Sequence, residues 1–328
     1  MSVDNQIRIG YYENWMFDQV IDLFVAQYHF DPDQRRTLFQ QFYEAPFQAS
    51  KCIRLVAMDG KTVCGFQSYF YWPYCYRGKT LQTFQSGGSL VSHHYRGRQI
   101  FARLLNFLAE TSRSDRPEIE FLIGFPTPMS YGNFLRNQWA NPLDLVWYVR
   151  PIHPFSLIRA YTPECSDWNF ETLGESIEAY IPEDQITLSK DVAFETWRRD
   201  CRAGDTPCFY FHYRDSNGTI RFELKPNRRG RINECVIGDV VRASPDPALL
   251  RAGLRALLRA AKGHSFLTIL SIALNGKSAD QSLVEAVREC GFFKLKKSMP
   301  FIVKPIGDFP ECTNPSRWNL LRTDTDTW

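Results

Sequence analysis

Residues Ser89–Leu105 read SLVSHHYRGRQIFARLL, and this stretch decides how the first half of the chain is interpreted. Its apolar start is typical of a strand, its middle is a short loop with two arginines and a glycine, and its end repeats apolar residues at helical spacing. The N-terminus of a helix exposes unpaired N–H groups and a partial positive charge, which suit a phosphate group. The stretch therefore predicts either an anion site at Arg96, Gly97 and Arg98 or a basic turn that only caps the helix.

The sequence around this stretch alternates between strand and helix patterns. An Asp59-Gly60 turn between two apolar runs predicts a hairpin, and Gly87-Gly88 inside an extended segment indicates a bulge. The predicted strands of the first half are 7–12, 53–58, 63–70, 80–92, 119–125 and 143–149, and its predicted helices are 17–25, 32–43, 100–108 and 130–137.

The second half repeats this rhythm, beginning with a hairpin whose turn is Asn217-Gly218. Its predicted strands are 208–213, 219–224, 235–241, 266–273 and 295–303, and its predicted helices are 194–199, 245–262 and 280–290. The repetition predicts a duplicated α/β domain rather than one large sheet. The predicted divisions are a first domain over 1–150, a proline-rich connector over 151–185 that partly covers it, a second domain over 186–306 and a tail over 307–328.

Composition limits the class of protein. The chain has 328 residues, of which 44% are hydrophobic and 23% are charged, so it can build folded cores. It has no run of about 20 apolar residues and no secretory signal pattern, so we expect a soluble, cytoplasmic protein. A net charge of +3 does not demand a nucleic-acid partner. The nine cysteines lack zinc-ligand spacing, and we expect no metal and reduced thiols.

The central stretch resembles motif A of the GCN5-related N-acetyltransferase (GNAT) superfamily. The matching positions are Val91, Tyr95, Arg96, Gly97, Arg98, Ile100, Leu104 and Leu105. The resemblance implies tandem GNAT-like domains of the α/β (α+β) class, each with a mixed, mostly antiparallel sheet flanked by helices. It also implies an N-acyltransferase that takes acetyl-CoA or another acyl-CoA as donor.

In that superfamily the strand end pairs with the pantetheine arm of CoA, and the loop and helix start hold the pyrophosphate. Carried over, Leu90 and Val91 would contact pantetheine. Gln99 stands where motif A has its second glycine, so its side chain is expected to crowd the phosphates. The residues that would surround the pyrophosphate are Arg96, Gly97, Arg98, Gln99, Ile100 and Phe101.

Residues 124–139 resemble motif B of the same superfamily, a strand followed by a short helix and a Gly-aromatic pair. In many members a tyrosine on that helix protonates the leaving thiolate, but Phe134 holds this position and cannot donate a proton. Thr127 replaces an asparagine at the strand end. Ser130 and Tyr131 remain as substitute proton donors, and Thr127 and Ser130 are also placed in the donor site. Loss of a general acid costs about 10²–10⁴-fold in rate.

The sequence does not identify a general base. His93 and His94 lie beside the phosphate loop and are expected to be solvated or structural. Gln82 and Gln85 occupy the strand where other members place a glutamate, and a glutamine cannot act as a base. The candidates from the second half, which would reach a cleft between the domains, are His212 and Asp239.

The second half resembles a degenerate domain of the same superfamily. Its counterpart of motif A, residues 240–248, has two prolines and no glycine, so we expect it to form one wall of an acceptor pocket rather than to bind CoA. The tandem layout and the pair Trp197-Arg198 resemble sugar N-acyltransferases that modify nucleotide-linked amino sugars for surface polysaccharides. The resemblance implies a small amine acceptor of that kind and no nucleic acid.

Two other functions stay open. One is an aminoacyl-tRNA-dependent transferase of the peptidoglycan type, which predicts a basic groove and a helical arm. The other is a catalytically inactive GNAT-like binding or scaffold protein, which the replacements at Gln99, Phe101, Thr127 and Phe134 together suggest. Affinity for acyl-CoA separates an active enzyme from an inactive module.

Two further clusters have a structural and a functional interpretation. The aromatic run Tyr69–Tyr76 would stack on a sugar or a base, but core and hairpin edge is the interpretation we favour. Arg228, Arg229 and Arg231 would meet acceptor phosphates, whereas a solvated loop is the commoner meaning of such a run.

Overall fold

The computed structural model describes residues 7–29, 31–153, 155, 163–172, 174–201 and 207–326. The main strands of the first half are β1 (Ile7–Tyr11), β2 (Ile53–Asp59), β3 (Thr62–Tyr71), β6 (Thr83–Val91), β7 (Phe121–Gly124) and β8 (Ala140–Pro151). Its helices are α1 (Phe17–Tyr28), α2 (Pro32–Phe39), α3 (Ile100–Asp115) and α4 (Pro128–Arg136). The predicted order of this half is confirmed, with α2 continuing into a π-helical turn at Gln40–Glu44.

The second half contains every element that its sequence pattern predicts, with shifted ends. Its strands are β10 (Phe209–Asp215), β11 (Gly218–Arg229), β12 (Ile232–Arg242), β13 (Ile269–Asn275) and β14 (Phe293–Pro305). Its helices are α5 (Val192–Cys201), α6 (Pro247–Lys262) and α7 (Ser282–Glu289).

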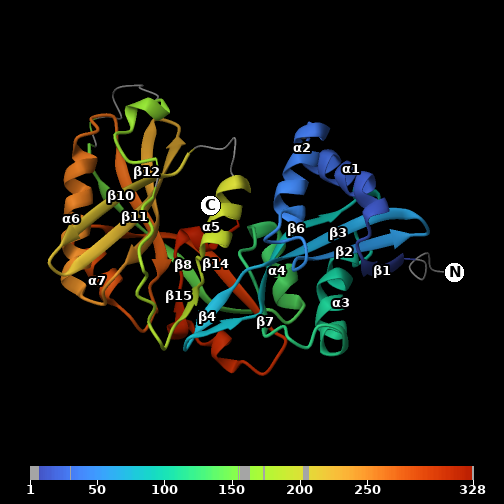
Figure 1. Ribbon diagram of the computed structural model, residues 1–328. Coiled ribbons are helices and arrows are strands. Elements are labelled where there is room, and N and C mark those ends of the chain that lie inside the picture. The colour runs from blue at the N-terminus through green and yellow to red at the C-terminus, as the bar shows by residue number, and fades with distance from the viewer. Residues whose placement is uncertain are drawn as a thin grey trace.

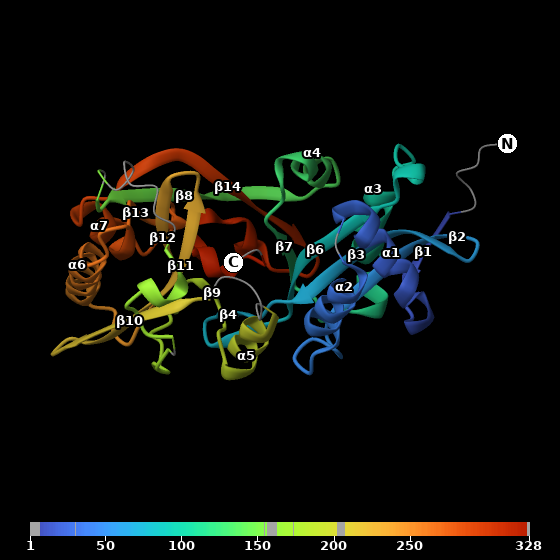
Figure 2. The ribbon, with the colours of Figure 1, turned by 90° about the horizontal axis from the view of Figure 1, so that it is seen from above.

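These strands form a single sheet of 11 strands in the order β1-β2-β3-β6-β7-β14-β8-β13-β12-β11-β10. The two halves occupy opposite ends of the sheet, with α1 and α2 on one face of the first half and α3 on the other (Figure 1; Figure 2). No helix in the described part of the chain is long and apolar enough to cross a membrane.

The last strand of each half pairs with the other half. In β14, Ile302–Pro305 run antiparallel to β7, and the strand continues antiparallel along β8. In turn, β8 pairs antiparallel with β13 over Leu145–Pro151. The strand beside β7 therefore comes from the second half of the sequence, and the strand beside β13 comes from the first.

This exchange corrects the expectation of two sheets rather than one. The strand β7 has only 4 residues, all buried, so its free edge must be covered by another strand. With 12 and 13 residues, β8 and β14 are long enough to do this for both halves. At about 3.3 Å per residue each spans roughly 40 Å.

A second, four-stranded sheet lies beside the main one. It joins the hairpin β4 (Tyr74–Tyr76) and β5 (Lys79–Leu81) to β9 (Ile186–Leu188) and β15 (Trp318–Asn319). The predicted strand 80–92 is thus wrong as one element, because residues 79–81 belong to this hairpin and the main-sheet strand begins at Thr83.

The described part of the connector packs mainly on the second half and also contacts the first. Trp168 is buried against Phe209, and Glu171 forms a β-bridge with Tyr210. Its contact with the first half is an ion pair of 3.0 Å between Arg77 and Asp184.

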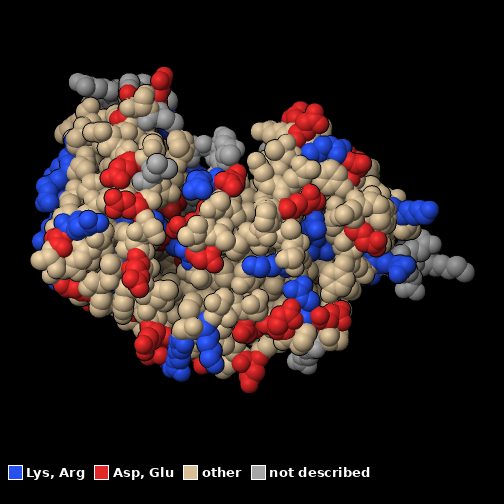
Figure 3. Space-filling view, viewed as in Figure 1, with Lys and Arg blue, Asp and Glu red and all other residues tan. Residues whose placement is uncertain are grey.

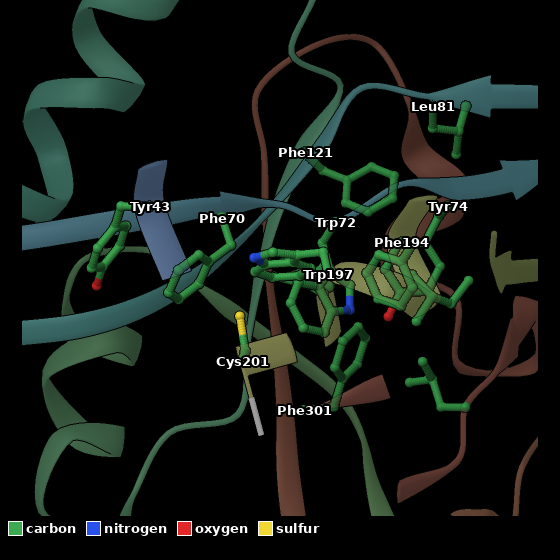
Figure 4. Close-up of a cluster of buried hydrophobic side chains, with 14 of the residues drawn as sticks. Tyr43, Phe70, Trp72, Tyr74, Leu81, Phe121, Phe194, Trp197, Cys201 and Phe301 are labelled. Atoms are coloured by element: carbon green, nitrogen blue, oxygen red, sulfur yellow. The ribbon is translucent and has the colours of Figure 1, made fainter. Parts of the chain in front are cut away.

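Helix α5 packs aromatic side chains against the core of the first half, where Trp197 lies beside Trp72 (Figure 4), and it also holds the C-terminal tail. Trp197 is buried against Phe47 and Trp72 of the first half, at ring-centroid distances of 5.4 and 5.7 Å. The neighbouring Arg198 is also buried, and its Nη2 donates a 2.9 Å hydrogen bond to the carbonyl of Thr325. The pair Trp197-Arg198 therefore has a structural role. The aromatic run from Tyr69 is buried in the core, as expected.

The strand exchange makes the first half dependent on the second. We expect a fragment of residues 1–151 to show no cooperative unfolding transition, because β7 and β8 both lose β14 as a partner. Urea unfolding followed by circular dichroism measures this, and co-expression with residues 152–328 should restore the transition. Cooperative unfolding of the isolated fragment would show that the exchange is not needed for folding.

Candidate active site

The loop before α3 takes the shape that motif A requires. Gly97 has φ +81°, and Gln99, the N-cap of α3, has φ +57° and ψ +18°. Both lie in the left-handed region, where a non-glycine residue costs about 1–2 kcal/mol. Gln99 therefore carries strain at the position where the motif has a glycine. The side chain of Gln99 makes no cap hydrogen bond.

The N–H groups at the start of α3 are open to an anion. The backbone N–H of Arg103 donates to the carbonyl of Gln99 at 3.0 Å, which begins the hydrogen bonding of α3. The N–H groups of Ile100, Phe101 and Ala102 precede it and have no partner within the helix. These N–H groups face the loop and carry the partial positive charge of the helix N-terminus.

A cavity of about 570 Å³ opens at this helix start. Asn133, Arg136 and Asn137 of α4 form its opposite wall. The predicted donor-site residues that line it are Val91, Arg96, Gly97, Gln99, Ile100 and Phe101, and those outside its lining are Leu90, Arg98, Thr127 and Ser130.

The two arginines of the loop differ in direction. Arg96 is exposed at the cavity and donates a 2.5 Å hydrogen bond to Gln27 Oε1. The Arg98 guanidinium lies 5.0 Å from the ring centroid of Tyr95, whose hydroxyl donates to Asp59 at 3.0 Å. Arg96 is therefore the arginine placed to meet a phosphate in the cavity.

An edge-to-face aromatic cluster occupies the place of the tyrosine that motif B usually carries. Phe134 is buried, with its ring 5.5 Å from Phe101 and 5.0 Å from Trp139. The two departures from the motifs at Phe101 and Phe134 thus compensate each other by packing. Neither ring supplies a proton donor.

The substitute proton donors lie at the start of α4. The hydroxyls of Thr127 and Ser130 are 3.2 Å apart, and Ser130 Oγ also donates to the carbonyl of Thr127 at 3.2 Å. Tyr131 is half-buried against the same apolar cluster as α3. Their hydroxyls therefore lie beside the cavity wall formed by α4 rather than in its lining.

The strands β6 and β7 part at the centre of the first half. They pair in parallel from Thr83–Gln85 with Phe121–Ile123, and their pairing ends there while β6 continues to Val91. On its other edge β6 carries the predicted bulge, where pairing with β3 shifts between Leu90 and Gly87. The backbone of β6 after Gln85 is thus open toward β7, which leaves room for an extended ligand to pair with it.

A buried polar network holds the bulge. Tyr43 Oη lies 3.0 Å from Ser68 Oγ, which donates a 2.6 Å hydrogen bond to the carbonyl of Gly87. Ser89 Oγ donates to the fully buried Gln67 at 2.5 Å. Burial raises the pKa of Tyr43 to about 12, so the phenol stays protonated as a hydrogen-bond donor.

The C-terminal tail places a carboxylate at the bulge. A Cβ added to Gly87 would lie 2.6 Å from the Phe70 ring, which leaves room only for a glycine, and 3.5 Å from Asp326 Oδ2, an ordinary contact distance. Burial raises the pKa of Asp326, and the charge of Arg198 lowers it in part. Gln85, whose side chain is fully buried, also lowers the pKa of this carboxyl group in part. Sequence reasoning missed Asp326.

The cavity and Asp326 lie on opposite faces of the sheet. Gly87 faces Phe70 and Tyr43, which belong to the cluster that packs under α1 and α2. Helix α3 packs on the other face, where Ile100 and Leu104 approach Gly65. A group that leads from the cavity to Asp326 would therefore pass between β6 and β7 where they part.

Comparisons with known proteins agree with this geometry. No protein-family model and no curated protein sequence matches the chain. Among solved structures, a probable N-acyltransferase from Enterococcus faecalis V583 matches with TM-score 0.61 and 10% identity, over 92% of this chain and 73% of its own. A GCN5-related N-acetyltransferase from Anabaena variabilis ATCC 29413 matches with TM-score 0.60 and 13% identity over the same shares. Another, from Kribbella flavida, has TM-score 0.51 and 12% identity, over 92% and 72%.

The chain has the GCN5-related N-acetyltransferase fold. The fold class implied by the resemblance of residues 89–105 and 124–139 is thus confirmed. In GNAT terms, β6 and β7 are the parted central strands of the first half, and β12 and β13, which pair in parallel over Glu234–Ile237 and Ile269–Ile272, are those of the second.

The second GNAT-like half places its candidate residues differently. Asp239 lines a cavity beside the tail, but this cavity is lined by residues 176–324 and is not a cleft between the two domains. His212 is held by the connector, because its ring contacts the Glu171 carboxylate at 2.9 Å and accepts from the N–H of Glu175. His93 and His94 are exposed, as expected.

The arginine run of the second half does not line a cavity with Asp239. It lies at the tip of the β11–β12 hairpin, where Arg229 pairs with Ile232, whereas Asp239 pairs with Glu223 farther along the same two strands. Arg229 is neutralised by Glu234 at 3.0 Å.

Two glycines of the GNAT-like first half distinguish the cost of a left-handed backbone from the cost of a steric clash. Gly88→Ala should lower the free energy of unfolding by about 2 kcal/mol or more, because its φ of +59° is left-handed and its Cβ would lie 2.7 Å from Tyr43 Oη. Gly97→Ala, whose Cβ would have nothing within 4 Å, should lose only about 1 kcal/mol. Urea unfolding measures both, and equal losses would show that the bulge tolerates a side chain.

The strain at Gln99 makes a second prediction. Gln99→Gly should bind CoA more tightly without loss of stability, because it removes a side chain from the cavity and relieves about 1 kcal/mol of left-handed strain. Gln99→Ala is the matched control, since it shortens the side chain but keeps the strain. Calorimetric titration with CoA and thermal unfolding measure the two effects. Weaker binding by the glycine variant would mean that Gln99 contacts the ligand favourably.

Proposed function

We propose that this GNAT-fold protein is an acyl-CoA-dependent N-acyltransferase. The observation that carries the proposal is the arrangement of an anion-binding cavity at α3 on one face of the sheet and a carboxylate, Asp326, on the other, joined where β6 and β7 part. This arrangement brings a donor and an acceptor together from opposite sides.

The donor half of the site follows from the cavity. The N-terminus of α3 and Arg96 hold the pyrophosphate of acyl-CoA, and the open edge of β6 from Leu90 and Val91 pairs with the pantetheine arm. The thioester then lies near the bulge at Gly87. Backbone N–H groups at the parting of the strands stabilise the oxyanion that forms during attack.

The transfer is a direct attack of an amine on the thioester carbonyl. The amine nitrogen forms the C–N bond and the carbonyl oxygen becomes an oxyanion, the amine proton passes to the carboxylate of Asp326, and the C–S bond breaks as the oxyanion collapses to the amide. CoA leaves as a thiolate and takes a proton from water or from the hydroxyl of Ser130 or Tyr131. The raised pKa of Asp326 suits this role, because a general base works best with a pKa closer to the operating pH.

The acceptor we propose is a small amine, and an amino sugar is the class that the motif resemblance supports. A nucleotide-linked amino sugar and a role in surface polysaccharides rest on that resemblance alone. The arginines near residue 229, a candidate phosphate site, lie at the far end of the hairpin from Asp239. We also propose a cytoplasmic location.

The donor site is tested by the two loop arginines. Arg96→Ala should weaken CoA binding by about tenfold, since a charge-assisted hydrogen bond contributes about 1.5–3 kcal/mol. Arg98→Ala, whose guanidinium lies over Tyr95, should weaken it less. Calorimetric titration with CoA and acetyl-CoA measures both. A folded wild type that binds neither would favour the tRNA-dependent or the inactive alternative.

The general base is tested by Asp326→Asn. We expect kcat to fall by about 100-fold or more with an unchanged affinity for acetyl-CoA. In the wild type the rate should fall as the pH drops through the pKa of Asp326, which lies above the usual value for an aspartate, and this acid limb should vanish in the variant. Asp308→Asn, at an exposed position of the same tail, is the control. An unchanged pH profile in Asp326→Asn would assign the base elsewhere.

A further inference from the structure

A second cavity, of about 440 Å³, opens in the second half where β12 and β13 part. Their parallel pairing ends at Ile237 and Ile272, and the residues that follow, including Asp239 and Asn275, line the cavity. It therefore occupies the position in the second half that corresponds to the parting of β6 and β7 in the first. The tail residue Asp324 forms part of its wall.

Three buried charged groups meet at this wall. Lys190 Nζ lies 2.8 Å from Asp239 Oδ1 and 3.1 Å from Asp324 Oδ1. The two carboxylates are 4% and 3% exposed, so they are nearly removed from water. Burial raises the pKa of Asp324, and the charges of the two aspartates raise the pKa of Lys190 against the effect of its own burial. One ammonium group thus serves two carboxylates.

Besides Lys190, Arg221 also interacts electrostatically with Asp239, but the lining of the cavity as a whole has more acidic than basic side chains. Its lining contains five acidic and three basic side chains, and the other two basic groups are already paired. Arg221 pairs with Glu195 at 2.9 Å, and Arg242 pairs with Asp280 at 2.5 Å. By contrast, acidic and basic side chains are interspersed on the face of the molecule shown in Figure 3. A buried excess of negative charge is costly unless a cation compensates it.

The remaining lining suits the carbon body of a small ligand. Leu250, Leu274 and Leu283 contribute apolar side chains, and Asn275 and Ser278 contribute polar ones. This composition, apolar walls with a few charged groups, is typical of small-molecule sites. An ammonium group has three donors and no acceptor, which matches carboxylates that have unused acceptor capacity.

We propose that this cavity binds the acceptor of the reaction as a small organic cation, with its ammonium group near Asp239 and Asp324. That the ligand is the acceptor of the reaction rests on the proposed function, whereas the binding of a cation does not. The tail makes the connection, because Asp324 and Asp326 are two residues apart and their Cα atoms lie within about 7 Å of each other. Asp326 and Gly87 do not line the cavity, so the cation site and the carboxylate at Gly87 are separate sites joined by the tail.

The acidic lining also selects among amino sugars. A free amino sugar or a polyamine brings a positive charge to Asp239, whereas a diphosphate would meet five acidic side chains in the same lining. We therefore infer that the acceptor enters the cavity with its cationic part and carries no phosphate into it.

The test is calorimetric titration of the full chain with D-glucosamine and with spermidine in the absence of acyl-CoA. At least one should bind, with N-acetylglucosamine, which lacks the charge, and uridine diphosphate-glucosamine binding more weakly than glucosamine. Asp239→Asn should weaken the cation by about tenfold or more, as loss of a charge-assisted hydrogen bond does. Glu285→Gln, on the exposed side of α7, is the matched control and should bind as the wild type does.

A second variant protects the test against misfolding of Asp239→Asn. Leu283→Trp fills the cavity from its half-buried wall without changing any charge, and it should abolish binding of the cation while leaving thermal unfolding unchanged. Cation binding that survives in folded Leu283→Trp, no binding by the wild type, or tighter binding of the nucleotide sugar would each overturn the proposal. Titration with acetyl-CoA separates the two hypotheses, because failure there with intact cation binding rejects only the N-acyltransferase assignment.

Discussion

The exchange of β8 and β14 is the constraint on which the rest of the structure depends. Because β14 runs beside β7 of the first half, the chain that follows it leaves the sheet between the two halves. The tail then returns over the second sheet through β15 and ends against β6. A tail that followed a strand at the outer edge of the second half would not reach this position. The candidate base at Asp326 is therefore a consequence of strand order.

The tail is held in place by groups from both halves. Trp72 of the first half donates a 3.0 Å hydrogen bond from Nε1 to the carbonyl of Asp324. Lys190 and Arg198, which lie in the second half of the chain, bind the Asp324 carboxylate and the Thr325 carbonyl. These contacts are buried, so breaking one leaves an uncompensated polar group. The segment that carries Asp326 is thus held by buried contacts from both halves of the chain.

Sequence reasoning located the local features and missed the long-range ones. The loop at Gly97, the bulge at Gly87-Gly88 and the hairpin turns are set by residues close together in the chain, so their patterns predict them. The exchange of strands depends on pairing between residues about 180 apart, as in Leu122 with Lys304, and no local pattern encodes it. Asp326 was missed for the same reason. Its alternating Thr-Asp segment has the composition of a solvated tail, and only the fold buries it.

The two halves use the same opening between parallel strands for opposite charges. In the first half the strands part beside a loop with Arg96 and an uncapped helix start, which attract an anion. In the second half the corresponding loop has two prolines, and the Asp246 carboxylate caps α6 by accepting from the N–H of Ala248, so its helix start is already satisfied. The acidic groups at Asp239 and Asp324 then give that opening a negative charge. The duplicated fold thereby offers one site for a donor with phosphates and another suited to a cation. The tail lines the cation site with Asp324 and reaches the opening of the first half with Asp326.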